Sequence, residues 1–236
     1  MHKLTAQATL ALAFVAAPAL AGGVTTQQFD TDAEINEIIV NEVFAAEGRY
    51  GNNNPSNGDW ELGIWSDGSL ADQEDFEWVS GRTVDFSLSF IPVGPVNLVT
   101  FSLFDNDAPL VRSVDSFEDD GFDSLLLRTR ATKDGSSIVL DDLKLNGELI
   151  SDTSFASGDD DGLGLLLLSL DGIDEGFNLD GTVTMNWGND TPRGSHLAFQ
   201  IKAVETTDLV VVPSPTAASL GLLAIVGLAA RRRRQA

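Results

Sequence analysis

The stretch at residues 84–90 reads Val-Asp-Phe-Ser-Leu-Ser-Phe, and it decides the fold class. Its four apolar side chains occupy every second position, and three polar side chains fill the positions between them. Successive side chains of an extended strand point to opposite faces, so this pattern predicts a strand with one buried face. The fold is therefore built from at least one sheet that covers a core.

Similar signals continue along the chain on both sides of this stretch. Trp60, Leu62 and Ile64 share one face of an expected strand. Further strand-like runs are Val96–Phe104, Ser124–Ala131, Ser137–Leu140, Leu163–Leu170, Thr182–Trp187 and Leu197–Val204. Between Leu143 and Ile150, the pair Asn146-Gly147 predicts a hairpin turn. Short strands joined by Asp, Gly and Asn turns predict an all-β, two-sheet β-sandwich, with a jelly-roll, concanavalin-like topology as the favoured arrangement.

Three segments depart from the alternating strand pattern. Thr31–Glu34 has the sequence of a helix capping box, but Ile38–Val40 is β-branched, so either a short helix or a bent strand is expected here. Gly48–Gly58 is rich in Asn, Gly and Pro and is expected to be a loop. Leu163–Leu170 lacks alternation, which predicts a strand covered on both faces.

The chain begins with a segment that has the features of a secretory signal peptide. Residues 1–21 contain a weak basic start, an apolar run and the small residues Ala19 and Ala21, which predict cleavage before Gly22. Residues 22–210 then form one acidic β-sandwich domain, long enough for a substantial core.

The last segment, residues 211–236, combines three features. Val212, Pro213, Ser214 and Pro215 form a Pro-x-Pro turn that keeps the backbone extended, an uncharged run of 15 residues follows, and Arg231, Arg232, Arg233 and Arg234 end it. As a helix the run would reach about 22 Å, short of the roughly 30 Å of a bilayer core. Four arginines directly after the run favour a membrane-sorting or anchoring helix over a buried one.

This tail resembles the PEP-CTERM class of bacterial sorting signals, in which a Val-Pro-Glu-Pro-like motif precedes a short transmembrane helix and an arginine cluster. Ser214 replaces the usual Glu. The resemblance implies recognition by an exosortase, a membrane-embedded peptidase. The domain is similar to the exported "choice-of-anchor" modules, through the stretches Trp60–Trp65, Phe122–Thr132, Ile138–Gly147 and Gly181–Trp187. That similarity implies a location and supplies no biochemical activity.

Charge and composition exclude several function classes. All 36 acidic residues lie between Asp30 and Asp208, with nine basic residues among them, which gives the domain a formal charge of −27. Phosphate contacts need a basic surface, so nucleic-acid binding is not expected, and neither is adhesion to anionic lipid. The absence of cysteine excludes disulfides and thiolate metal sites.

No enzymatic activity and no catalytic residue are predicted. His196, beside Ser195, is the only histidine after residue 2, and no Gly-x-Ser-x-Gly elbow occurs. A glycosidase needs two carboxyl groups at a defined separation, and Glu61 and Glu77, each next to a tryptophan, would be the first pair to inspect.

Two kinds of ligand remain open. Oxygen-rich turns could hold calcium, and the alternative is that they are solvated acidic turns; the residues concerned are Asp105, Asp107, Asp119, Asp120, Asp159, Asp160 and Asp161. Glycan binding would use aromatic faces, for which Trp65 and Tyr50 are the candidates, while Trp60 is expected in the core.

The sequence therefore predicts an exported protein without catalytic activity of its own. It would pass transiently through the inner membrane, held by the C-terminal helix, to the cell surface or extracellular matrix of a Gram-negative-type bacterium. The expected partners are an exosortase-like membrane peptidase and, in addition, exopolysaccharide. The alternative function is a lectin-like carbohydrate-binding module, with or without calcium.

Overall fold

Strands dominate the part of the chain that the structure describes, in which fourteen strands accompany one short helix. The computed structural model describes residues 24–50, 60–66, 68–93, 96–105, 108–115, 121–170, 176–189, 192 and 194–207, with backbone alone at 93, 96, 105 and 108–115. The elements are β1 (Thr25–Phe29), α1 (Asp32–Asn36), β2 (Ile39–Arg49), β3 (Leu62–Ser66), β4 (Ser69–Glu74), β5 (Thr83–Val93), β6 (Val96–Asp105), β7 (Ala108–Asp115), β8 (Ser124–Ala131), β9 (Ser137–Leu145), β10 (Glu148–Leu149), β11 (Ser154–Ser157), β12 (Leu163–Ser169), β13 (Phe177–Asn186) and β14 (Leu197–Thr206).

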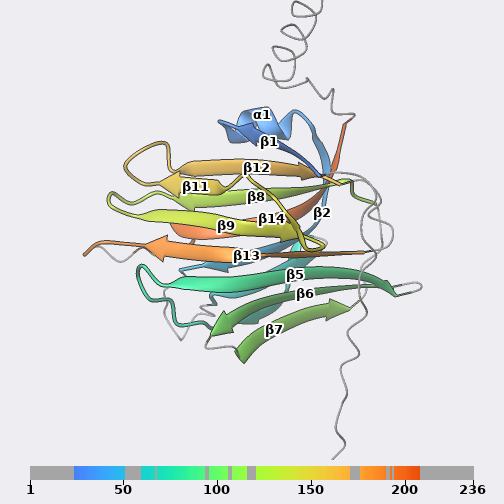
Figure 1. Ribbon diagram of the computed structural model, residues 1–236, viewed down its shortest axis with the longest axis horizontal. Helices are drawn as coiled ribbons and strands as arrows, with labels where there is room; N and C mark the ends of the chain where they lie inside the picture. Colours follow the sequence, from blue (N-terminus) through green and yellow to red (C-terminus); the bar gives the residue numbers. More distant parts are fainter. Residues whose placement is uncertain are drawn as a thin grey trace, which may run out of the picture. The chain divides into compact units, whose positions relative to one another are not determined.

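The strands form two antiparallel sheets that pack face to face as a sandwich (Figure 1). Sheet 1 has the order β1-β12-β8-β14-β2-β3-β4. Sheet 2 has the order β10-β9-β13-β5-β6-β7, and β11 pairs with β9 at the same edge as β10. β11 also lies beside β8 and β12 of sheet 1, so it spans the gap between the sheets at this edge.

Phenylalanine side chains from both sheets meet in the core. Phe199 of β14 lies 5.8 Å from Phe86 of β5 and 6.0 Å from Phe101 of β6, measured between ring centroids. Phe44 of β2 stacks on Phe90 of β5 at 6.1 Å. Each fully buried phenylalanine contributes about 1.5–3 kcal/mol. These contacts between sheets hold the two layers together.

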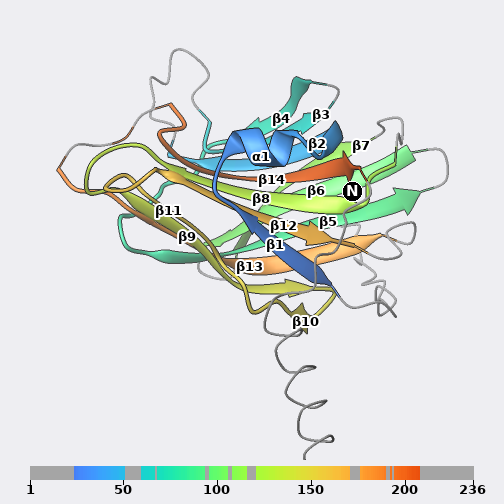
Figure 2. The ribbon, with the colours of Figure 1, turned by 90° about the horizontal axis from the view of Figure 1, so that it is seen from above.

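A second, smaller apolar layer lies on the outer face of sheet 1. Ile35, the buried residue of α1, is 1 % exposed, and Leu126, Leu165 and Leu167 are buried outside the cluster of core residues between the sheets. The helix lies beside β1 and β2 (Figure 2). This explains why the leucine run of β12 is buried on both faces, as its lack of alternation predicts.

An ion pair fixes α1 to sheet 1. Both oxygens of Asp32 accept hydrogen bonds from Arg128 of β8, at 3.0 and 2.8 Å. The Arg128 guanidinium lowers the pKa of the Asp32 carboxyl, against the opposing effect of burial. Both side chains of this ion pair are partly solvent-exposed, so the pair contributes modestly to stability.

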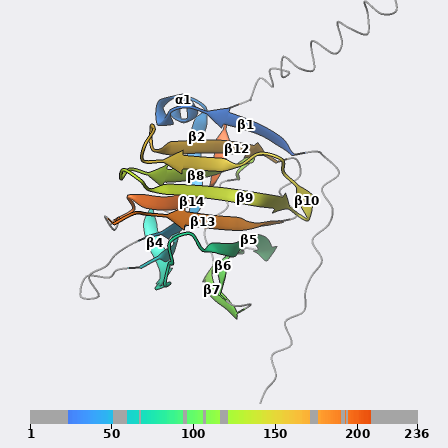
Figure 3. The same cartoon turned by 60° about the vertical axis from the view of Figure 1, so that its left-hand side comes forward.

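Several sequence predictions are confirmed. Strand β8 has the predicted bounds, and β6, β12 and β14 match theirs to within two residues. At the Asn146-Gly147 turn both residues have positive φ, 51° and 84°, and Leu145 pairs with Glu148 across a two-residue loop (Figure 3). The capping box is present, with the Glu34 amide bound to Thr31 Oγ1 at 3.2 Å. In the segment after Thr31 both expected alternatives occur in turn: the short helix α1 ends at Asn36, and the β-branched run that follows enters strand β2.

Other predictions need correction. β2 continues through Gly48 and Arg49, where a loop was expected, because both pair with β14. A Cβ atom at Gly48 would lie 2.2 Å from the Phe199 ring, so the glycine there makes room for a core side chain. Strands β1, β4, β7 and β11 were not predicted.

The predicted signals at the two ends lie outside the described residues. These are the signal peptide at residues 1–21 and the tail at residues 211–236. Within the described part of the chain, no helix has the length and apolar character to cross a membrane.

Candidate functional site

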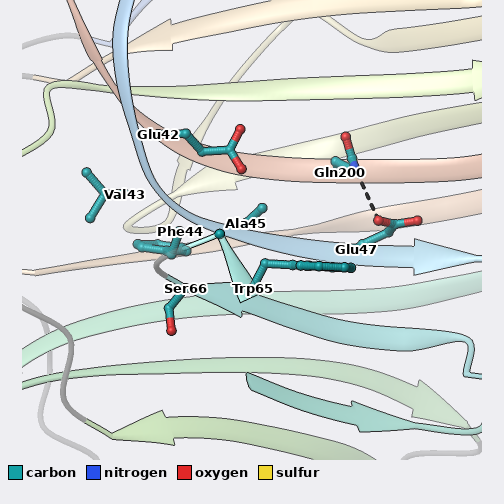
Figure 4. A pocket seen from close by; sticks show the side chains of 9 residues that line it. Glu42, Val43, Phe44, Ala45, Glu47, Trp65, Ser66 and Gln200 are labelled. Atoms are coloured by element: carbon teal, nitrogen blue, oxygen red, sulfur yellow. Dashed lines mark hydrogen bonds between the residues drawn. The ribbon is translucent and has the colours of Figure 1, made fainter. Parts of the chain in front are cut away.

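A groove of about 280 Å³ lies on the outer face of sheet 1, and we call it the Trp65 groove. Its lining residues come from β2, β3, β14 and the turn after β3: Glu42, Val43, Phe44, Ala45, Glu47, Trp65, Ser66, Gly68 and Gln200. The strand pleat explains the arrangement, because Ala46 and Ile64 point into the core while Ala45, Glu47 and Trp65 point away from it. The indole of Trp65 extends towards Glu47 (Figure 4).

Glu47 is a nearly buried carboxylate at the edge of this groove, with 5 % of its surface exposed. Gln200 donates from Nε2 to Glu47 Oε2 at 2.9 Å, and Ser195 donates from Oγ to Glu47 Oε1 at 3.0 Å. Ser195 also accepts a hydrogen bond from Arg49 at 3.2 Å. A buried charge needs such partners, and each oxygen of this carboxylate has one.

Trp65 packs against a second tryptophan. Its ring centroid lies 6.2 Å from that of Trp60 in an edge-on arrangement, and the Arg49 guanidinium lies 3.6 Å from the Trp60 ring centroid. Trp60 is buried, but it lies over Gly63 outside the core cluster, where a Cβ atom on Gly63 would approach its ring to 2.8 Å. The prediction of a core Trp60 is thus correct for burial and wrong for the face, because β3 begins only at Leu62.

The indole nitrogen of Trp65 is buried and has no hydrogen-bond partner among the described residues. A buried donor without a partner costs about 1–3 kcal/mol. Because the nitrogen is covered, the part of the ring that lines the groove is carbon. Trp65 therefore offers an apolar surface and is half-buried, as a binding platform would be.

Tyr50 does not join Trp65. Its ring lies 4.6 Å from that of Trp187, and both are partly buried and packed against the core. Trp78 lies close by, with its indole N–H donating to the Arg49 carbonyl at 2.9 Å. The two predicted glycan residues thus lie in different aromatic pairs, and only Trp65 lines the groove.

The acidic turn at residues 159–161 is exposed, and its carboxylates bind different backbone amides. Asp159 accepts from Gly135 N–H at 2.9 Å, and Asp161 accepts from Leu163 N–H at 3.2 Å. Among the described residues, no group of three or more His, Cys, Asp or Glu side chains is arranged to hold a metal ion. Asp107, Asp119 and Asp120 lie outside the described residues, and at Asp105 only the backbone is described.

A second depression, of about 550 Å³, lies on the outer face of sheet 2. Its charged residues are Asp85, Asp142, Lys144 and Asp180, on three neighbouring strands. Asp142 has a φ of 50° beside a register shift between β9 and β13, so it belongs to a β-bulge. Asp180 accepts a hydrogen bond from Asn178 at 2.6 Å.

The residues considered for catalysis serve other contacts. His196 Nδ1 lies 2.6 Å from Thr132 Oγ1, and burial lowers the pKa of His196, with Lys133 and Arg130 lowering it further. Glu61 accepts from the Phe76 amide at 3.2 Å, and Glu77 is exposed. Ser195, which donates to Glu47, holds a φ of 58° in the turn before β14.

Glu47 and Gln200 were missed in the sequence. The signal lay in β2, where Ala45, Glu47 and Arg49 occupy every second position, but the composition from Gly48 onwards was interpreted as a loop and the strand was not followed to Arg49. Cross-strand pairing of Gln200 with Glu47 is a long-range register that the sequence does not display. Neither a protein-family model nor a curated protein matches this chain.

Proposed function

We propose that the chain is an exported protein whose β-sandwich is sorted by an exosortase-like membrane peptidase and has no catalytic activity of its own. The observation that carries the proposal is the extent of the folded unit. Its strands run from Thr25 to Thr206, so the predicted signals at 1–21 and 211–236 precede and follow the strands in sequence. A signal that a membrane enzyme reads has to be separate from the strands that form the core, and the order of the segments along the chain is compatible with that need.

In this proposal the domain crosses the inner membrane, is held briefly by the C-terminal helix, and is released or anchored at the cell surface or in the extracellular matrix. The peptidase acts near Val212–Pro215, and Arg231–Arg234 keep the end of the chain on the cytoplasmic side. The sorted protein then lies among exopolysaccharide.

Fractionation of the host tests this proposal. The wild-type chain is expected in the extracellular or surface fraction, and a variant with Pro213→Ala and Pro215→Ala is expected to stay with the inner membrane. A Ser214→Ala variant is the matched control, because it keeps both prolines. Equal release of all three chains would contradict processing at this motif.

A second candidate function is a lectin-like carbohydrate-binding module, and the Trp65 groove favours it. A half-buried indole beside carboxylate, amide and hydroxyl groups combines an apolar platform with a few polar groups, as small-molecule sites do. The full-length protein on a glycan array, with calcium and with a chelator, tests this function. Binding to no glycan in either condition would reject it, and binding only with calcium would add the predicted cation.

We also propose a jelly-roll, concanavalin-like topology for the sandwich. Its support is that β2 and β14, near opposite ends of the folded unit, pair in the middle of sheet 1, while consecutive strands such as β8 and β9 lie in different sheets. An experimental structure with another connection order would contradict it.

A further inference from the structure

The Trp65 groove has the chemistry of a site for one sugar unit of a neutral glycan chain, and we infer that it binds such a chain. This inference rests on the carbohydrate-binding function proposed above and adds the location of the site and the class of glycan. Four properties of the groove carry it: an apolar platform, a polar wall, the charge balance and the volume.

The platform is the Trp65 ring. Trp65 pairs across the strands with Ala45, whose small side chain leaves space above β2, and the ring extends along that strand towards Glu47 (Figure 4). Because its nitrogen is buried, the ring presents carbon and its π face rather than a hydrogen-bond donor. A pyranose with equatorial hydroxyls has an apolar C–H face that packs on such a surface.

The polar wall lies beside the platform. Glu47 is held in place by Gln200 and Ser195, so its orientation is fixed before a ligand arrives. Each carboxylate oxygen can accept more than one hydrogen bond, so Glu47 can also accept from sugar hydroxyls. Ser66 adds a hydroxyl that can donate or accept. A preorganised wall of this kind lowers the entropic cost of binding.

The net charge of the Trp65 groove favours some classes of glycan over others. The groove contains two carboxylates, Glu42 and Glu47, and the ammonium of Lys202 binds Glu42 at 2.6 Å. One negative charge is therefore in excess, which repels a uronate or a sulfate. To reach the nearly buried Glu47, the ammonium of an amino sugar would have to give up much more hydration than a hydroxyl does, so an amino sugar gains little from the excess charge. A neutral, hydroxyl-rich ring is the class that remains.

The volume fits one ring rather than a long segment. Small-molecule pockets measure about 300–1,000 Å³, and this groove, at about 280 Å³, lies just below that range. The rest of a glycan chain would extend over the outer face of sheet 1.

Calorimetric titration of the full-length protein tests the inference. The probes are three neutral hexamers (cellohexaose, laminarihexaose and mannohexaose), hexagalacturonate as the acidic probe and hexaglucosamine as the cationic probe. We expect a neutral hexamer to bind best. Trp65→Ala should weaken that binding by about tenfold or more, the loss of one stacked ring. Trp65→Phe should bind more tightly than Trp65→Ala, because it restores an aromatic platform.

Trp187→Ala is the matched control, because Trp187 is also half-buried but pairs with Tyr50 outside the groove. It should leave the affinity unchanged, and circular dichroism confirms that each variant is folded. Preference for the acidic or cationic hexamer, or equal affinity in Trp65→Ala, would overturn this inference and leave carbohydrate binding standing. Binding to none of these probes would also overturn it. Carbohydrate binding itself falls only if the broad array is negative.

Discussion

Gln200 donates a hydrogen bond of 2.9 Å to Glu47, and this contact joins the neighbouring strands β14 and β2 on the outer face of sheet 1. Glu47 is 5 % exposed, yet it lies outside the core cluster between the sheets. A charge that is nearly buried on an outer sheet face, beside a half-buried tryptophan, is the least expected feature of this sandwich. Proteins bury a charge against the usual packing rules mainly at functional sites, so this carboxylate supports the choice of the Trp65 groove as the candidate site.

Glu47→Gln should lower the free energy of unfolding by about 1–3 kcal/mol. The new amide places an N–H₂ group opposite Ser195 or Gln200, so one acceptor contact is lost while the site stays buried. Glu42→Gln is the matched control: Glu42 is exposed and paired with Lys202, and its loss should cost under about 1 kcal/mol. Urea unfolding measures the loss of unfolding free energy in both variants. Equal losses would contradict the claim that the buried Glu47 contributes more to stability than the exposed Glu42.

Trp65→Phe and Trp78→Phe should differ in their cost to stability. Trp65 has a buried indole N–H without a partner among the described residues, so the change removes an unsatisfied donor and should cost under about 1 kcal/mol. Trp78→Phe deletes a 2.9 Å bond to the Arg49 carbonyl and leaves that oxygen unpaired, for a loss of about 2–3 kcal/mol. Thermal and urea unfolding measure the loss of stability in each variant. A larger loss for Trp65→Phe than for Trp78→Phe would show that the Trp65 nitrogen has a hydrogen-bond partner in solution.

The Asp32–Arg128 pair should make the stability of the protein depend on pH in the acidic range. The pKa of Asp32 is lowered in the folded protein, so its contribution is complete above the unfolded value near 3.8 and is lost as the pH falls through the folded value. Asp32→Asn should therefore cost about 0.5–1 kcal/mol at pH 7 and nothing at a pH where the wild-type carboxyl is protonated. Asp134→Asn, at an exposed carboxylate, serves as the control. A cost for Asp32→Asn that is the same at both pH values would refute the ion-pair explanation.

His196 should give a second, separate pH dependence. Its pKa is lowered from 6.5, so the unfolded chain binds the proton more tightly and acid favours unfolding. Stability should be complete above about pH 6.5 and should fall as the pH drops below it. The only other histidine is His2, so the difference between wild type and His196→Gln isolates this group. Melting temperatures at pH 7.5 and 5.5 measure it. A wild-type drop no larger than that of the variant would contradict the assignment.

The fold class could be predicted from the sequence because burial imposes a period of two on β5 and β14. The strands that were missed have other compositions. β1 is Thr-Thr-Gln-Gln-Phe and almost wholly exposed, so no alternation marks it. β11 is four residues long and is held by tertiary contacts, including Ser154 with Thr129 at 3.1 Å. Local composition carries little information about strands of either kind.

The candidate site could be predicted only in part. Trp65 was identified because its position alternates with Ile64, which places it on the outer face. Its partners come from strands far along the chain, since Glu47 and Gln200 are separated by 153 residues. Tyr50 was grouped with Trp65 because it is an aromatic residue in an Asn-rich stretch, and the structure places it against Trp187 instead. Which residues come together in such a site depends on the register between distant strands, and the sequence does not display that register.

Intact mass spectrometry of the mature protein from its own host tests sorting through the tail. If the tail is a processed sorting signal, the mature chain begins at Gly22 and ends within Val212–Pro215, without Arg231–Arg234. A mature chain that retains the four arginines and ends at Ala236 would contradict it.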